Sequence, residues 1–209
     1  MTARFARTRV LGTTAWQGAH GDALLAPFVP SPAIVTAAAL DMLALGPADS
    51  FLDLGCGDGR VVAAALMRGV RRAVGVEIDA ELAHAAEARM LSARRAAARG
   101  RPAGPPAVAQ IVRADLRGAV AAALLAEATA VFLFLSPAGA AFASSALHAD
   151  GRALRCVSCD FALPDGGRWR LAESRRVLDL ELGLFVPRER RAPEHGARLG
   201  LCDAARPVG

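Results

Sequence analysis

The stretch that decides the fold is Phe51-Leu-Asp-Leu-Gly-Cys-Gly-Asp-Gly-Arg60. The apolar residues around Asp53 predict a buried strand, and residues 61–67, which are all apolar, predict a helix after the turn. Between them, glycine stands at every second position: Gly55, Gly57 and Gly59. Glycine permits tight dihedral angles and lets a ligand lie against bare backbone. The stretch therefore predicts a ligand-binding turn between a strand and a helix.

The spacing of these glycines indicates which ligand the turn accepts. It is G-x-G-x-G, which differs from the G-x-G-x-x-G that places a pyrophosphate on a helix N-terminus. Asp53, just before the turn, favours a ligand that carries an ammonium group. The stretch resembles motif I of the class I S-adenosylmethionine-dependent methyltransferases. The resemblance implies S-adenosyl-L-methionine as the cofactor, with Cys56 and Asp58 in the cofactor-binding turn as well.

Two further acids follow at the ends of predicted strands. Strand 73–77 ends in Glu77, where a carboxylate can accept both hydroxyls of a ribose, while Asp79 is expected to cap the next helix. Strand 108–113 is followed by Asp115, which by the family resemblance meets the adenine amino group. The alternative is that all three acids are helix caps in an unrelated α/β protein. The order of Asp53, Glu77 and Asp115, together with the glycine turn, favours the cofactor pocket.

Strands and helices alternate along most of the chain, which predicts a parallel sheet with right-handed crossovers. Ser31 is expected to cap the first helix, with Pro32 at its first position and Gly46-Pro47 ending it. The last two strands are expected to form an antiparallel hairpin. The predicted fold is α/β: a single Rossmann-like, seven-stranded class I methyltransferase sheet, mostly parallel with a C-terminal antiparallel hairpin. The expected helices span 33–45, 58–69, 80–99, 117–127 and 137–148, and the expected strands span 50–54, 73–77, 108–113, 130–135, 153–159, 169–173 and 177–186.

A chain of 209 residues suffices for one such domain. We expect a basic leader at 1–25, a methyltransferase domain at 26–186 and a flexible basic tail at 187–209, with a breaker-rich loop at 100–106. The leader is either a disordered segment or a targeting segment, since it resembles an arginine-rich mitochondrial presequence. No apolar run is long enough to predict a transmembrane segment. A mitochondrial or cytoplasmic location is expected.

Charge and cysteine usage narrow the possible partners. The net charge is +5, and all 25 basic residues are arginine because lysine is absent. The arginines are spread along the chain, which favours a solvated surface over a nucleic-acid or anionic membrane surface. Cys156 and Cys159 form a C-x-x-C without a second ligand pair, and within a strand they point to opposite faces. No structural metal is expected, and the four cysteines fit a reducing compartment.

Three segments indicate the methyl acceptor. They are Pro27-Phe-Val-Pro-Ser-Pro32, Phe132-Leu-Phe-Leu-Ser-Pro137 and Val157-Ser-Cys-Asp-Phe161, the last followed by Trp169. The chain lacks the Asn/Asp-Pro-Pro-Tyr of methyltransferases that act on adenine or glutamine amides, and the metal-binding acids of catechol-type enzymes. With the glycine turn, the segments resemble the small mitochondrial protein-lysine methyltransferases and their prokaryotic relatives. This family includes the adenine nucleotide translocase and ATP synthase c-subunit lysine methyltransferases. The resemblance implies SN2 methyl transfer to a lysine amine of a protein substrate.

By that resemblance Phe28, Pro30 and Ser31 lie over the cofactor and the acceptor channel. Each acceptor-side candidate also has a structural alternative. Ser136 either contributes to the site or caps the next helix, and Asp160 either handles the ammonium or pairs with an arginine. The aromatic residues either enclose the lysine or belong to the core: Phe28, Phe161 and Trp169. Two functional alternatives remain, a methyltransferase acting on nucleic acid or a small molecule, and a degenerate cofactor-binding scaffold.

Overall fold

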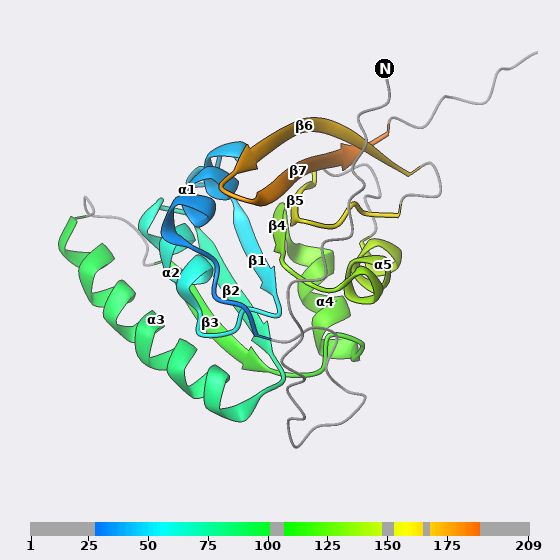
Figure 1. The fold of residues 1–209 in the computed structure, drawn as a ribbon. Coiled ribbons are helices and arrows are strands. Elements are labelled where there is room, and N and C mark those ends of the chain that lie inside the picture. Colours follow the sequence, from blue (N-terminus) through cyan, green and yellow to red (C-terminus); the bar gives the residue numbers. More distant parts are fainter. Residues whose placement is uncertain (1–27, 101–106, 148–152, 165–167, 189–209) are drawn as a thin grey trace, which may run out of the picture.

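A computed structural model describes residues 28–100, 107–147, 153–164 and 168–188. Seven strands form one sheet in the order β3-β2-β1-β4-β5-β7-β6 (Figure 1). The first five are mutually parallel, and β7 runs antiparallel to both β5 and β6. This confirms the predicted fold class. The strands are β1 (Ser50–Leu54), β2 (Arg72–Glu77), β3 (Val108–Arg113), β4 (Ala130–Leu133), β5 (Arg155–Cys159), β6 (Trp169–Val177) and β7 (Leu180–Pro187).

Helices cover both faces of the sheet (Figure 1). One face packs against α1 (Ala33–Met42), α2 (Arg60–Met67) and α3 (Ala80–Gly100), and the other against α4 (Ala119–Glu127) and α5 (Pro137–Ala146). Successive side chains of β1 alternate between the two cores, so that Phe51 lies in the first and Leu52 in the second. No helix in the described ranges is both long and apolar enough to span a membrane.

The predicted turn lies at the point where the strand order of the sheet reverses, between β1 and β4. β1 pairs with β2 on one side and with β4 on the other. Ligands of open α/β sheets bind outside the carboxyl ends of the strands at such a switch point. The turn after β1 and the segment after β4 are in contact there, since a Cβ on Gly55 would lie 2.8 Å from Cδ2 of Leu135.

Several predicted helix and strand ends differ from the structure. The N-cap of α1 is Pro32 and no side chain caps it, so the prediction that Ser31 caps this helix is wrong. The same helix ends at Met42 because Ala44 adopts a left-handed φ of 46°. The hairpin turn lies at Leu178, with φ 56°, and not at the predicted residues 174–176. The predicted loop 101–106, leader 1–25 and tail beyond residue 188 lie outside the described residues.

Hydrogen bonds and an ion pair connect the amino ends of the central strands, at the opposite edge of the sheet from the glycine turn. Asp49 accepts hydrogen bonds from the Thr129 hydroxyl at 2.7 Å and from the Gly46 N–H at 2.8 Å, and it pairs with Arg155. Arg155 also donates to the Leu43 carbonyl at 2.6 Å. Burial raises the pKa of Asp49, but these hydrogen bonds outweigh it and hold the pKa below its usual value.

Candidate active site

The glycine turn is closely packed on both sides. Gly57 has φ 53° and Gly59 has φ 75°, both in the left-handed region. A Cβ on Gly57 would lie 2.3 Å from Cε2 of Phe28, and a Cβ on Gly59 would lie 2.8 Å from Cβ of Ala86 in α3. Position 57 therefore admits the Phe28 ring against bare backbone, while position 59 allows α2 and α3 to approach each other.

Asp53 is the buried acid beneath this turn. Its exposed fraction is 2%, and no described residue donates a hydrogen bond to its carboxylate. Burial, and secondarily the negative charges of Glu77 and Asp58, raise its pKa well above the usual value. A buried carboxylate without a partner is costly, and a cation beside it would relieve that cost. The site thus fits the ammonium group of an amino-acid-bearing cofactor, as the sequence predicts.

Glu77 holds the turn from β2. Its Oε2 accepts the Gly57 N–H at 2.8 Å, and its Oε1 accepts the N–H groups of Ile78 at 2.8 Å and Asp79 at 3.0 Å. Because each carboxylate oxygen has two acceptor positions, Oε2 retains capacity for a ribose hydroxyl. Asp79 caps α3 as predicted, accepting two N–H bonds, each 2.9 Å, from its first turn.

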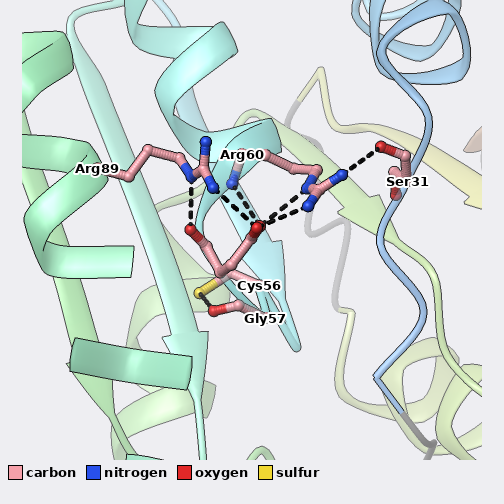
Figure 2. Close-up of polar contacts among 6 residues, drawn as sticks. Ser31, Cys56, Gly57, Arg60 and Arg89 are labelled. Carbon is pink, nitrogen blue, oxygen red and sulfur yellow. Dashed lines mark hydrogen bonds and ion pairs between the residues drawn. The ribbon is translucent and has the colours of Figure 1, made fainter. Parts of the chain in front are cut away.

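Asp58 forms ion pairs with two arginines, Arg60 and Arg89. Both arginines are labelled in Figure 2. Arg60 donates from Nε to Oδ1 at 2.9 Å and from Nη2 to Oδ2 at 2.7 Å. Arg89 of α3 donates to Oδ2 and to the Asp58 main-chain carbonyl, both at 2.9 Å. The Arg60 hydrogen bond, helped by the charges of both arginines, holds the pKa of Asp58 below its usual value despite burial. The contact of Asp58 with the cofactor stays a prediction, and its carboxylate already has two cationic partners.

Cys56 is buried, and its thiol packs against β2. A Cβ on Gly75 of β2 would lie 2.6 Å from its Sγ and 2.9 Å from Cγ2 of Val62. Burial, followed by the charge of Asp53, raises the thiol pKa, so the thiol is neutral. The backbone of Cys56, whose N–H donates to the Val76 carbonyl at 2.9 Å, is the part of this residue that shapes the turn.

Asp115 lies beyond the end of β3, two strands away from the glycine turn. Arg117 donates from its main chain to Oδ1 at 2.8 Å and from Nη2 to Oδ2 at 2.7 Å. The Arg117 hydrogen bond lowers the pKa of this partly exposed carboxyl group. The Ala114 N–H donates to the Glu77 carbonyl at 3.0 Å, which ties this segment to the end of β2. The adenine-binding role of Asp115 stays a prediction.

The predicted acceptor residues follow β4 and β5. Ser136 caps α5 by accepting the Gly139 N–H at 3.2 Å, which is its structural alternative. Asp160 has a left-handed φ of 63° and exchanges hydrogen bonds with Glu181 of β7, at 2.7 and 3.0 Å. No arginine of the described residues pairs with Asp160. The strained backbone at this edge of the sheet is typical of functional sites.

The aromatic candidates separate into two groups. Phe28 is 45% exposed and its ring lies against Gly57, and Pro30 beside it is also exposed. Phe161 is partly exposed, and its carbonyl accepts the Ser158 hydroxyl at 2.6 Å. Trp169 is 1% exposed and belongs to the core beneath α4 and α5, so the structure selects its core alternative.

The two cysteines of the C-x-x-C lie on opposite faces of the sheet. Cys156 lies in the core beneath α4 and α5, and Cys159 in the core on the opposite face of the sheet, which confirms the predicted orientation. Burial raises the pKa of both thiols. Within the described ranges, no group of three or more histidine, cysteine or acidic side chains is arranged to hold a metal ion.

The sheet order, the antiparallel last strand pair and the glycine turn after β1 define a class I methyltransferase. An RNA methyltransferase from Salinibacter ruber, solved in complex with S-adenosyl-L-homocysteine, is 26% identical, with a TM-score of 0.62 over 81% of this chain and 100% of that chain. A putative methyltransferase from Escherichia coli, 16% identical, has a TM-score of 0.55 over 80% of this chain and 92% of that one. The second likeness supports the fold alone.

The match to a protein family is more specific. Residues 53–169 match the ANTKMT methyltransferase domain, and the chain belongs to this family. A curated relative from Saccharolobus islandicus, named protein-lysine N-methyltransferase, is 45% identical over 56 residues. That match covers 26% of this chain and 35% of the relative, so it spans about a third of the relative's length. The family and the S-adenosyl-L-homocysteine complex support S-adenosyl-L-methionine as the cofactor.

Sequence reasoning missed the two arginines beside the turn. Arg60 follows the last glycine of the motif directly, so its position was visible, but nothing local indicates that it reaches residue 31. Arg89 lies 31 positions after Asp58, in the middle of a helix with several arginines. Only the packing of α2 against α3 selects it.

Proposed function

We propose that this chain is an S-adenosyl-L-methionine-dependent protein-lysine N-methyltransferase. The observation that carries the proposal is the match of residues 53–169 to the ANTKMT methyltransferase domain. The 45% identity over 56 residues to a protein-lysine N-methyltransferase supports the same acceptor. The substrate partner is a protein that presents a lysine side chain.

In the proposed pocket, four features hold the cofactor. Asp53 binds the ammonium group, and the backbone of the glycine turn lies beneath the cofactor. Glu77 accepts hydrogen bonds from the ribose hydroxyls, and Asp115 accepts one from the adenine amino group. S-adenosyl-L-methionine supplies an activated methyl group whose bond to sulfur breaks as the acceptor nitrogen bonds to the carbon. The buried carboxylate of Asp53, which receives no hydrogen bond from any described residue, is the feature that supports this orientation most directly.

On the acceptor side, the lysine amine has to be neutral at the moment of attack, because its lone pair forms the new bond. We assign to Asp160 the orientation of the lysine ammonium and the acceptance of its proton, directly or through water. Its left-handed backbone and its bonds to Glu181 fix it at the end of β5. The ring faces of Phe28 and Phe161 pack the lysine stem, and Ser136 shapes the site by capping α5. Positioning of the amine then supplies much of the rate.

A mitochondrial or cytoplasmic location is part of the same proposal. It rests on the arginine-rich, acid-poor leader at 1–25 and on the cysteine usage. Fluorescent fusions of the full chain and of a chain that starts at residue 26 distinguish the two compartments. Loss of mitochondrial signal in the shorter fusion supports a presequence, and an unchanged cytoplasmic signal opposes one.

The acceptor is tested by labelling a lysate of the source organism with tritiated S-adenosyl-L-methionine and the purified protein. We expect label that survives nuclease, is released by protease and maps to lysine by mass spectrometry. Because the chain contains no lysine, labelled lysine cannot come from the protein itself. The matched control is the Asp53→Asn protein, which keeps the side-chain shape and loses the charge. Label confined to other residues would overturn the lysine assignment.

One observation favours a second candidate function, methyl transfer to RNA. The Salinibacter ruber RNA methyltransferase is 26% identical to this chain and is covered completely by the match. In the same assay, RNA methylation predicts label that nuclease removes and protease does not. Absence of any label, together with absence of cofactor binding, would indicate a degenerate scaffold.

A further inference from the structure

The segment of residues 28–31 lies over the glycine turn and is fastened there by Arg60. Nη1 of Arg60 donates to the Ser31 carbonyl at 3.2 Å (Figure 2). Among the described residues, this is the one hydrogen bond between residues 28–31 and the rest of the protein. The Phe28 ring at the start of the segment fits against the bare backbone of Gly57. Apart from the covalent connection to α1, the position of this ring therefore depends on its packing and, among the described residues, on the hydrogen bond from Arg60.

Arg60 is itself held in place by Asp58. Two of its nitrogens bind the Asp58 carboxylate, at 2.9 and 2.7 Å, and leave Nη1 directed at Ser31. A guanidinium suits this task because its donors form a rigid planar fork, which an ammonium lacks. The Asp58 side chain is 13% exposed, so its ion pairs are screened less than those of an open surface.

Asp58 is in turn held from α3 by Arg89. This side chain contacts both the carboxylate and the main-chain carbonyl of Asp58, so it fixes the orientation of the residue as well as its charge. The contact is possible because α3 approaches the turn closely at Gly59. The chain of contacts runs from α3 to the turn and from the turn to the segment that carries Phe28.

We propose that Arg60 and Arg89 are positioning residues which act through Asp58 to hold Phe28 over Gly57 as the apolar cover of the cofactor pocket. An apolar cover keeps water away from the buried carboxylate of Asp53, which strengthens its attraction for a cofactor ammonium. That this cover also supports methyl transfer to lysine rests on the proposed function. That it strengthens cofactor binding does not depend on the identity of the acceptor.

Calorimetric titration with S-adenosyl-L-homocysteine tests this cover in the full chain. We expect Arg60→Met, Arg89→Met and Phe28→Ala each to weaken binding about tenfold, as loss of a charge-assisted contact or of its target implies. The matched control is Arg94→Met, an exposed arginine of the same helix for which the described residues offer no hydrogen bond or ion pair. The control should bind as the wild type does, and all four melting temperatures should remain close to that of the wild type.

The double variant Phe28→Ala/Arg60→Met provides the decisive comparison. If Arg60 acts through Phe28, the double variant binds no more weakly than Phe28→Ala alone. Losses that multiply, or wild-type affinity of Arg60→Met, would overturn the proposal. Arg60→Gln repeats the test if the methionine variant does not fold. If the variants show this pattern but the wild-type protein methylates no lysine, the proposed acceptor is wrong and the proposed cover of the cofactor pocket still stands.

Discussion

The substitution Asp53→Asn examines the centre of the proposed cofactor pocket. Asparagine keeps the shape of the side chain and removes its negative charge. Asp53 is 2% exposed, its carboxylate has no hydrogen-bond donor among the described residues, and it lies near the charges of Glu77 and Asp58. Ionised Asp53 is therefore unfavourable by itself and becomes favourable when a cofactor ammonium lies beside it.

The expected loss of affinity follows from this burial. Removing one partner of a buried ion pair costs about 3 kcal/mol, which corresponds to roughly a hundredfold weaker binding. The stability of the cofactor-free protein should move the other way. The pKa of Asp53 is raised in the folded state, so the free energy of unfolding falls as the pH rises from the unfolded pKa to the folded pKa. At neutral pH the asparagine variant should melt no lower than the wild type.

Calorimetry with two ligands checks this reasoning. S-adenosyl-L-homocysteine carries the ammonium group, whereas 5′-methylthioadenosine lacks the amino-acid part. We expect Asp53→Asn to weaken binding of the first and to leave binding of the second nearly unchanged. Asp179→Asn, at the exposed turn between β6 and β7, is the matched control. A loss of less than about threefold for S-adenosyl-L-homocysteine, or equal losses for both ligands, would refute the assignment of Asp53 to the ammonium.

Three further predictions concern the turn and the opposite edge of the sheet. Gly57→Ala should lower the free energy of unfolding by about 2 kcal/mol and weaken S-adenosyl-L-homocysteine binding, since the new Cβ meets the Phe28 ring at a left-handed φ. Gly69→Ala, also at positive φ but with nothing within 4 Å of the new Cβ, should cost only about 1 kcal/mol and leave binding unchanged in the same denaturation and calorimetry experiments. Glu77→Ala should abolish binding and also lower stability in chemical denaturation by about 2–3 kcal/mol, because three backbone N–H groups lose their acceptor; undiminished stability would contradict this. Because the folded pKa of Asp49 is lowered, its contribution to the free energy of unfolding is present above the unfolded pKa and is lost as the pH falls through the folded pKa. Asp49→Asn should therefore be less stable than the wild type at about pH 7. In acid denaturation, this difference should shrink below about pH 4.

The sequence predicted the sheet where local signals are strong. The strands at 50–54 and 108–113 have the predicted bounds, and the antiparallel pair at the end of the chain is confirmed. Strands like these are marked by apolar or alternating runs between breakers, which are local properties. Element ends were less predictable, as at Ser31 and Ala44, because they depend on backbone angles that neighbouring elements help to decide.

The roles of polar side chains divide in the same way. Asp79 and Ser136 act on the first turns of their own helices, so a sequence spacing of two or three residues was enough to predict their caps. The partners of Asp160 lie 21 residues further along the chain, in β7, where no local pattern points. Asp160 therefore exchanges hydrogen bonds with Glu181 where an arginine was the structural alternative, because the pairing of β5 with β7 brings Glu181 beside it.

The sequence by itself determined that a glycine turn and three acids stand at the ends of successive strands, because strand, turn and breaker signals are local. Tertiary structure decided how the acids around the turn differ. Asp53 has no partner among the residues that the structure describes, whereas Asp58 is paired with Arg60 and Arg89. The physical reason is that a charge takes its partner from whatever packs beside it, and the close approach of α3 at Gly59 brings Arg89 to Asp58 but not to Asp53.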